Sequence, residues 1–102
     1  MKTIAVVIAS APGSPNLERA RVLACQMEQS GNRVVVCLWQ DAVLAAVNGK
    51  SEGTSGETWV LEEDLTLRGF GPGDMVPGAR PVGYEALLDL WMSRCDAVLG
   101  AF

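Results

Sequence analysis

Hydrophobic and polar positions divide the first forty residues into two apolar runs on either side of an amphipathic stretch. Residues 3–9 and 33–39 are nearly continuous in apolar, mostly β-branched side chains, which is typical of strands covered on both faces of a parallel sheet. Between them, apolar residues recur at helical spacing, at Leu17, Ala20, Leu23, Ala24 and Met27. The pattern predicts a strand–helix–strand unit with a right-handed crossover.

The same alternation continues toward the C-terminus. We expect short helices at 42–47 and 62–68, strands at 58–61, 80–82 and 97–102, and a helix at 84–94. Its inward side chains are expected to be Leu87, Leu88 and Trp91, with Leu90 as a further candidate. Pro81 confines its strand to an edge or a strand start, and the glycine-rich residues 48–57 are expected to form a flexible loop. Alternating β and α elements predict a three-layer α/β/α sandwich with a mostly parallel sheet of four or five strands. Its 102 residues are expected to form one domain, 1–102.

Composition and charge exclude several classes of function. The chain has a net charge of −4 and no histidine, which argues against direct nucleic-acid binding, a Cys-His or Ser-His-Asp site, and any histidine-ligated metal. No apolar run approaches the roughly 18 residues of a membrane span. An odd number of cysteines without an export signal indicates a reducing cytoplasm. The hydrophobic share of 49% is high for a small domain and suggests contact with other subunits.

Two glycine-containing stretches do not fit nucleotide-binding motifs. Gly49-Lys50-Ser51 lacks the earlier glycine and the preceding strand of a phosphate loop. The glycines of residues 69–73 follow a predicted helix, whereas a dinucleotide fingerprint follows a strand. We therefore expect no cofactor and no metal.

One candidate ligand site follows the first two strands. Ser10, Gly13 and Ser14 lie in the turn after the first strand, where open α/β sheets bind ligands and a helix N-terminus can hold an anion. Asp41 and the acids of residues 62–64 follow the second and third strands, so the same edge of the sheet could serve acid–base chemistry or bind a cation. The alternatives are an N-cap role for Ser14 and acids that stabilise helix starts.

The three cysteines differ in their predicted surroundings. Cys37 lies within an apolar strand and is expected to be inert core. Cys95 lies between the last helix and the last strand, at the amino edge of a parallel sheet, where structural roles are more common. Cys25 lies off the apolar face of the first helix, four residues from Arg21, which could favour the thiolate. Cys25 is therefore the candidate reactive thiol.

Several segments, taken in order, resemble the DsrE/DsrF/DsrH-like superfamily and most closely its DsrH/TusB subunits. Residues 59–70, WVLEEDLTLRGF, are similar to the family's leucine-x-x-acid-leucine-x-x-arginine-glycine stretch. Residues 40–46, QDAVLAA, resemble its QDGVYAA segment, and residues 76–90 its PGV–VDY–VDL segment. The ending at 95–102 fits the family's last strand. The opening Ser10-Ala11-Pro12 with a longer first helix looks more like DsrE subunits.

The resemblance implies a cytoplasmic subunit of a sulfur-relay complex, with DsrE- and DsrF-like chains or further copies of itself as partners and a sulfur-donor protein upstream. A sulfurtransferase subunit of this kind passes persulfide sulfur between thiolates. The sequence departs from the family pattern at three places. The DsrH-type cysteine position falls at Ala24, with Cys25 one residue later; Glu62-Glu63 stand where DsrE chains carry cysteine; and Gly83 replaces a frequent aspartate.

Two other functions remain open from the sequence. A non-catalytic scaffold or homo-oligomeric subunit of the same fold would need no reactive cysteine. A small-molecule or anion binder would use Ser10, Gly13, Ser14 and Asp41.

Overall fold

A computed structural model describes residues 2–47 and 57–100. In chain order the elements are β1 (Thr3–Ile8), α1 (Pro15–Gln29), β2 (Arg33–Leu38), the 3₁₀ helix η1 (Gln40–Ala46), β3 (Glu57–Leu61), α2 (Glu62–Leu67), the 3₁₀ helix η2 (Pro72–Asp74), β4 (Ala79–Val82), α3 (Tyr84–Asp89), its π-helical continuation η3 (Leu90–Arg94) and β5 (Ala97–Leu99).

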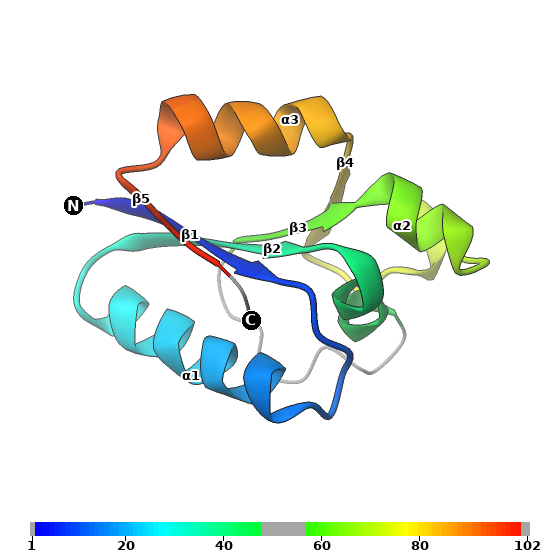
Figure 1. Ribbon diagram of the computed structural model, residues 1–102, viewed down its shortest axis with the longest axis horizontal. Coiled ribbons are helices and arrows are strands. Elements are labelled where there is room, and N and C mark those ends of the chain that lie inside the picture. Colours follow the sequence, from blue (N-terminus) through cyan, green and yellow to red (C-terminus); the bar gives the residue numbers. More distant parts are fainter. Residues whose placement is uncertain (1, 48–56, 101–102) are drawn as a thin grey trace.

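All five strands form one parallel sheet in the order β4-β3-β2-β1-β5 (Figure 1). β1 and β2 pair along their whole length, from Thr3↔Arg33 to Ile8↔Leu38, and all but the first residue of each is buried. Two inner strands with continuous apolar runs are what a sheet covered on both faces requires. The predicted fold class is therefore confirmed.

Helices cover the two faces of the sheet and make two separate cores. On one face, Leu17, Ala20 and Ala24 of α1 pack with the side chains of Val6 and other alternate strand residues, together with η1 and Leu65. On the other face, Leu87 and Leu90 pack against Ala5, Val7 and Cys37. Figure 1 shows α1 below the sheet and α3 above it, which gives the three predicted layers.

The ends of α1 follow the predicted capping chemistry. Ser14 is the N-cap, its Oγ accepts a hydrogen bond from the Leu17 N–H at 3.2 Å, and Pro15 occupies the first turn. After Ser30 the chain turns at Gly31, which has a φ of +92°. Glycine adopts this left-handed conformation without the steric cost of a Cβ.

The structure corrects the predicted inner face of the last helix. Leu87 and Leu90 are buried, but Leu88 is 36% exposed. One residue turns a side chain by about 100° around an α-helix, so neighbouring leucines cannot both face the sheet. The helix also does not stay α-helical to Arg94, because its last five residues form the π-helix η3.

Other boundaries differ by smaller amounts. The helix predicted at 42–47 begins at Gln40 and is 3₁₀, and the last strand is described only as Ala97–Leu99. The loop predicted at 48–57 lies outside the described residues except for Glu57, which begins β3. Pro81 lies in β4, at an edge of the sheet as predicted. Within residues 2–47 and 57–100, no helix combines the length and apolarity needed to cross a membrane.

Candidate functional site

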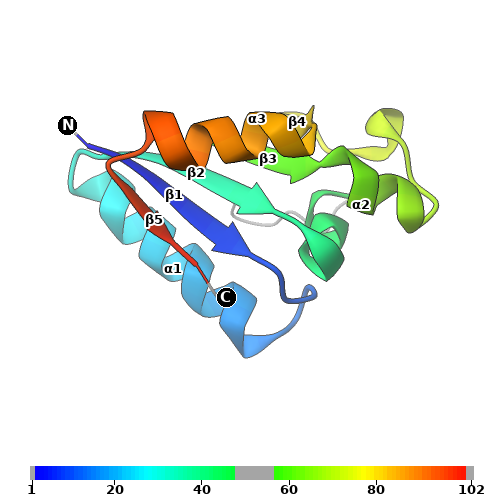
Figure 2. The ribbon, with the colours of Figure 1, turned by 45° about the horizontal axis from the view of Figure 1, so that its top comes forward.

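The carboxyl edge of the sheet brings together several of the predicted ligand-binding residues. Ile8 and Leu38 are paired at the ends of β1 and β2, so Ser10 and Asp41, two and three residues farther on, follow the same edge. Figures 1 and 2 both show the loop after β1 running beside η1. The two halves of the candidate ligand site therefore belong to one end of the sheet.

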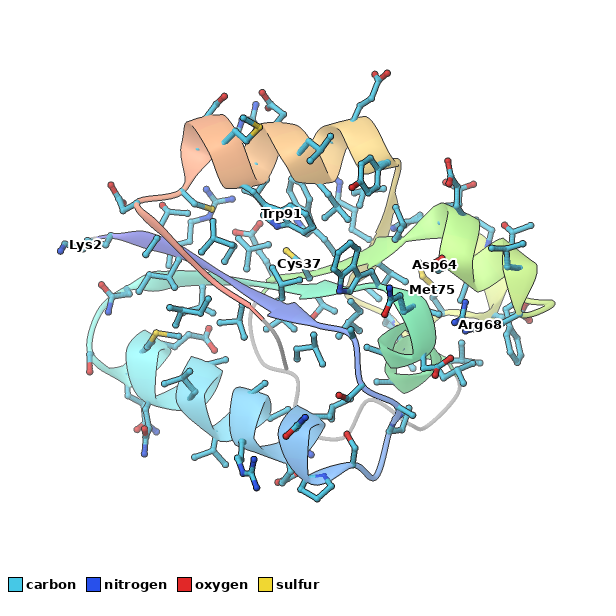
Figure 3. All side chains as sticks on the ribbon, viewed as in Figure 1. Lys2, Cys37, Asp64, Arg68, Met75 and Trp91 are labelled. Atoms are coloured by element: carbon cyan, nitrogen blue, oxygen red, sulfur yellow. The ribbon has the colours of Figure 1, made fainter. Side chains whose placement is uncertain are left out.

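Asp41 already has a partner in the fold. The guanidinium of Arg68, which ends α2, reaches Asp41 Oδ1 with Nη2 at 2.8 Å and with Nε at 3.2 Å. The Nη1 of Arg68 also donates to the backbone oxygen of Asp64 at 3.0 Å, and Figure 3 labels both residues in the same region of the molecule. Arg68 therefore offsets the negative charge that a bound anion would meet at Asp41.

Asp64 fixes the backbone where β2 ends. Its Oδ2 accepts a hydrogen bond from the Gln40 N–H at 2.6 Å. Gln40 has a φ of 51°, the sole positive φ of a non-glycine residue within the described parts of the chain. The left-handed conformation is unfavourable for such a residue, and the carboxylate of Asp64 stabilises it. The prediction that Asp41 and Asp64 share one edge is correct, and both act there through contacts within the fold, while Glu62 and Glu63 are exposed.

The loop from Ser10 to Ser14 is arranged by the start of α1. Gly13 has a φ of +87°, and the Ser14 N–H donates to the Ala11 oxygen at 3.1 Å. Because Ser14 Oγ accepts from the Leu17 N–H, this hydroxyl caps the helix. Ser10 is half-buried. The role of these residues in ligand binding stays a prediction.

The three cysteines lie in three different environments, as the sequence predicts. Cys25 is exposed, Cys37 is buried and Cys95 is half-buried, and all three are free thiols. Burial raises the pKa of the Cys37 thiol to about 11. Burial also raises the pKa of Cys95, with Arg33 acting in the opposite direction. Reaction with another molecule requires an accessible thiolate, and Cys25 alone of the three is exposed.

Cys25 lies on the outer side of α1. Ala24, one residue earlier, is 5% exposed and packs in the core, whereas Val22 on the outer side is 51% exposed. A shallow, open depression on α1 is lined by Pro15, Glu18, Arg19, Val22, Leu23 and Gln26, and Cys25 is not among its lining residues. The nearby cation predicted to favour the thiolate, Arg21, is engaged by Glu18 at 2.8 Å.

Cys37 belongs to an aromatic cluster that the sequence did not reveal. The Trp91 Nε1–H donates to Cys37 Sγ at 3.4 Å, and the Trp91 ring meets Trp39 edge to face, with centroids 5.6 Å apart. Figure 3 shows Trp91 and Cys37 facing each other between α3 and the sheet. The two residues are 54 positions apart, so no local pattern could have signalled the contact. It encloses the Cys37 thiol within the core.

Cys95 lies at the opposite, amino edge of the sheet. Arg33 and Glu57, which begin β2 and β3, form a two-pronged ion pair with distances of 2.6 and 2.9 Å. Next to it, the Arg80 guanidinium lies over the Trp59 ring, 5.0 Å from its centroid. These contacts link β2 to β3 and β3 to β4 near the amino ends of the strands. Among the residues that the structure describes, no group of three or more histidine, cysteine or acidic side chains is placed to bind a metal ion.

Comparisons with solved structures show the fold, and a family model shows the family. The YchN protein of E. coli superposes with a TM-score of 0.81 at 22% identity, covering 99% of this chain and 100% of that one. MTH1491, a protein of unknown function from Methanobacterium thermoautotrophicum, gives a TM-score of 0.71 at 14% identity, with 97% of each chain covered. No curated protein sequence matches the chain. The family described as DsrH like protein matches residues 14–96, and the chain therefore belongs to the DsrH-like family.

Proposed function

We propose that this chain is a subunit of a cytoplasmic sulfur-relay assembly and that Cys25 carries the sulfur as a persulfide. Membership of the DsrH-like family over residues 14–96 supports the class of function. The exposure of Cys25 supports its assignment as the sulfur carrier. We further propose that residues 1–102 act as one domain and bind neither nucleic acid nor membrane directly.

The observation that carries the assignment is the orientation of neighbouring residues on α1. Ala24, where the family's cysteine position falls by spacing, is 5% exposed and belongs to the core. Cys25 is exposed on the outer side of the same helix. A carrier thiol has to approach a donor persulfide and then a second thiol, so in this chain position 25 suits the task and position 24 does not.

The chemistry needs no added oxidant or reductant. The Cys25 thiolate attacks the terminal, sulfane sulfur of a donor persulfide, R–S–SH. A new S–S bond forms at Cys25, the donor S–S bond breaks, and the donor leaves as its thiolate, RS⁻. The acceptor thiolate then attacks the terminal sulfur of the Cys25 persulfide in the same way, so sulfur moves without a net redox change.

The partners of this relay would be DsrE- and DsrF-like subunits or further copies of the chain, together with a sulfur-donor protein. Exposed apolar side chains on α3 and η3 support association: Tyr84 is 43% exposed and Met92 is 82% exposed. Large apolar side chains on the surface favour subunit contacts.

Intact-mass measurement after incubation with a sulfane-sulfur donor tests the assignment. Wild type is compared with the Cys25→Ser, Cys37→Ser and Cys95→Ser variants. We expect wild type to gain one sulfur atom that a reductant removes, and Cys25→Ser alone to lose that gain. Loading that persists in Cys25→Ser but disappears in Cys95→Ser would place the carrier at the other edge of the sheet.

A scaffold role is the second candidate function. Arg21, the cation nearest to Cys25 along the outer helix face, is paired with Glu18 at 2.8 Å, so its charge is shared. If no cysteine takes up sulfur while another DsrH-like protein does under the same conditions, the chain acts as a scaffold subunit.

Binding of an anion at Ser10, Gly13, Ser14 and Asp41 has less support, because Asp41 is already paired with Arg68 and Ser14 Oγ already accepts from the Leu17 N–H. An increase in the melting temperature on addition of phosphate or nucleotide would support anion binding.

A further inference from the structure

An apolar stripe runs along one side of α3 and η3. Tyr84, Leu88 and Met92 follow each other at four-residue spacing and are 43%, 36% and 82% exposed. Residues four apart lie on the same side of a helix. None of the three belongs to the core that Leu87 and Leu90 form with the sheet.

The stripe faces the β5 side of the molecule. Leu87 points to the sheet, and Leu88 is turned from it by about 100°. Because α3 is right-handed and runs against the strands, this rotation carries Leu88 toward β1 and β5. Figure 2 shows β5 at the front of the sheet, clear of α3.

Val98 extends the stripe onto the sheet. It pairs with Ala5, whose side chain packs in the core on the α3 side. Neighbouring residues of paired strands point to the same face, so Val98 is on this side too, and it is 41% exposed. We call Tyr84, Leu88, Met92 and Val98 the α3–β5 surface.

The two edge strands of the sheet differ in composition. The other edge strand, β4, contains Arg80 and Pro81, which discourage strand addition. β5 consists of Ala97, Val98 and Leu99, with neither charge nor proline. An apolar helix side next to a strand that has neither charge nor proline is typical of a surface that another chain covers.

The charges beside the surface decide which chain covers it. Glu85 and Asp89 are exposed and lie one residue after Tyr84 and Leu88, on the solvent side of the stripe. Arg94 contacts Asp89 at 3.3 Å and offsets one of the two acids. In an antiparallel twofold pairing of α3 with a second copy, Glu85 and Asp89 would face the same acids of that copy. Like charges across an interface are unfavourable.

We propose that the α3–β5 surface binds a different protein chain, one that offers an apolar patch bordered by lysine or arginine side chains. The inference rests on the proposed function and deepens it, because it places the contact with a DsrE- or DsrF-like relay subunit at this surface. In this proposal, Glu85 and Asp89 attract the basic side chains of that subunit, which speeds association and favours this partner over others.

Binding to the DsrE- and DsrF-like subunits of the same organism tests the proposal. The full chain and its variants are titrated with each purified subunit, and affinities and association rates are measured at low and at high salt. Met92→Glu and Leu88→Glu are each expected to weaken binding by about 30-fold or more. The matched control Leu67→Glu changes an equally exposed apolar residue on α2 and is expected to stay within about threefold.

The role of the two acids is tested with a Glu85→Lys, Asp89→Lys double variant. We expect its association rate to fall about tenfold at low salt and to approach that of wild type at high salt, because salt screens exposed charges. All the variants change exposed residues, and circular dichroism checks that they fold.

The outcomes separate this inference from the proposed function. If wild type binds a subunit and Met92→Glu and Leu88→Glu bind equally well, the α3–β5 surface is not the contact, while the relay function stands. If wild type forms a homodimer that Met92→Glu disrupts, the occupant is a second copy and the proposal is wrong. If wild type neither binds these subunits nor loads sulfur, the proposed function itself fails.

Discussion

At the scale of single residues, three cysteines in one small fold differ because of what surrounds them. Cys37 is enclosed by the sheet and Trp91, Cys95 is partly covered at the amino edge, and Cys25 is open to solvent. The sequence predicts this ranking well, because position within a strand or on a helix face is a local property. The Trp91 contact with Cys37 was not predictable, since it depends on how α3 crosses the sheet.

Alkylation of the native protein should distinguish the thiols. At mildly alkaline pH we expect iodoacetamide to modify Cys25 first, Cys95 at least about tenfold more slowly, and Cys37 only after unfolding, because burial restricts access and favours the protonated thiol. Intact mass followed over time measures the order. A Cys25→Ser variant that keeps the fast phase would contradict it.

The raised pKa of Cys37 predicts a loss of stability in base. In the unfolded chain this thiol ionises near its ordinary pKa, whereas in the fold it stays protonated to about pH 11. Between roughly pH 9 and 11 the unfolded state therefore binds fewer protons, and the free energy of unfolding falls as pH rises. Urea unfolding of wild type and Cys37→Val should show the steeper fall in wild type. Equal slopes would mean that Cys37 does not titrate differently on folding.

At the scale of elements, helix ends could be predicted when their chemistry is local. Ser14, Pro15 and Gly31 mark the limits of α1 in the sequence, and the structure places them there. The end of α3 could not be predicted in the same way. Its π-helical turn depends on packing against β1 and β2, and two adjacent leucines give no local sign of which one faces the sheet.

Removal of the α1 cap should destabilise the protein. Ser14→Ala deletes the oxygen that accepts from the Leu17 N–H, and we expect the free energy of unfolding to fall by about 1 kcal/mol. Ser93→Ala on the exposed surface of η3 is the control and should change it by less than about 0.5 kcal/mol. Chemical denaturation measures both, and equal effects would argue against the cap.

The adjacent leucines of α3 form a matched pair. Leu87 is fully buried and Leu88 is 36% exposed, so Leu87→Ala should lower the free energy of unfolding by about 2–5 kcal/mol and Leu88→Ala by less than about 1 kcal/mol. Denaturation by urea provides the comparison. A larger loss of unfolding free energy in Leu88→Ala than in Leu87→Ala would contradict the observed orientation of the two side chains.

At the scale of the whole molecule, the fold class followed from the alternation of apolar runs and amphipathic stretches, and the five-stranded parallel sheet confirms it. The edge shared by Asp41 and Asp64 was also predictable, because the carboxyl ends of parallel strands coincide. Their partners were not. The pairing of Arg68 with Asp41 joins α2 to η1, residues 27 positions apart, and gives Asp41 a partner within the fold.

The proposed relay requires a second chain, because sulfur has to pass from this protein to an acceptor thiol. The fold supplies an exposed thiol on α1 and, on the other side of the sheet, the α3–β5 surface. In the proposal, Cys25 carries the sulfur and the α3–β5 surface binds a partner subunit.

The most direct test is transfer from the loaded chain. Protein carrying one sulfur atom at Cys25 is freed of donor and mixed with a reduced DsrE-like subunit, and the intact masses of both chains are followed. We expect the mass of one sulfur atom to leave this chain and to appear on the subunit. Sulfur that stays on Cys25, or is lost to solvent without reaching the subunit, would contradict the relay.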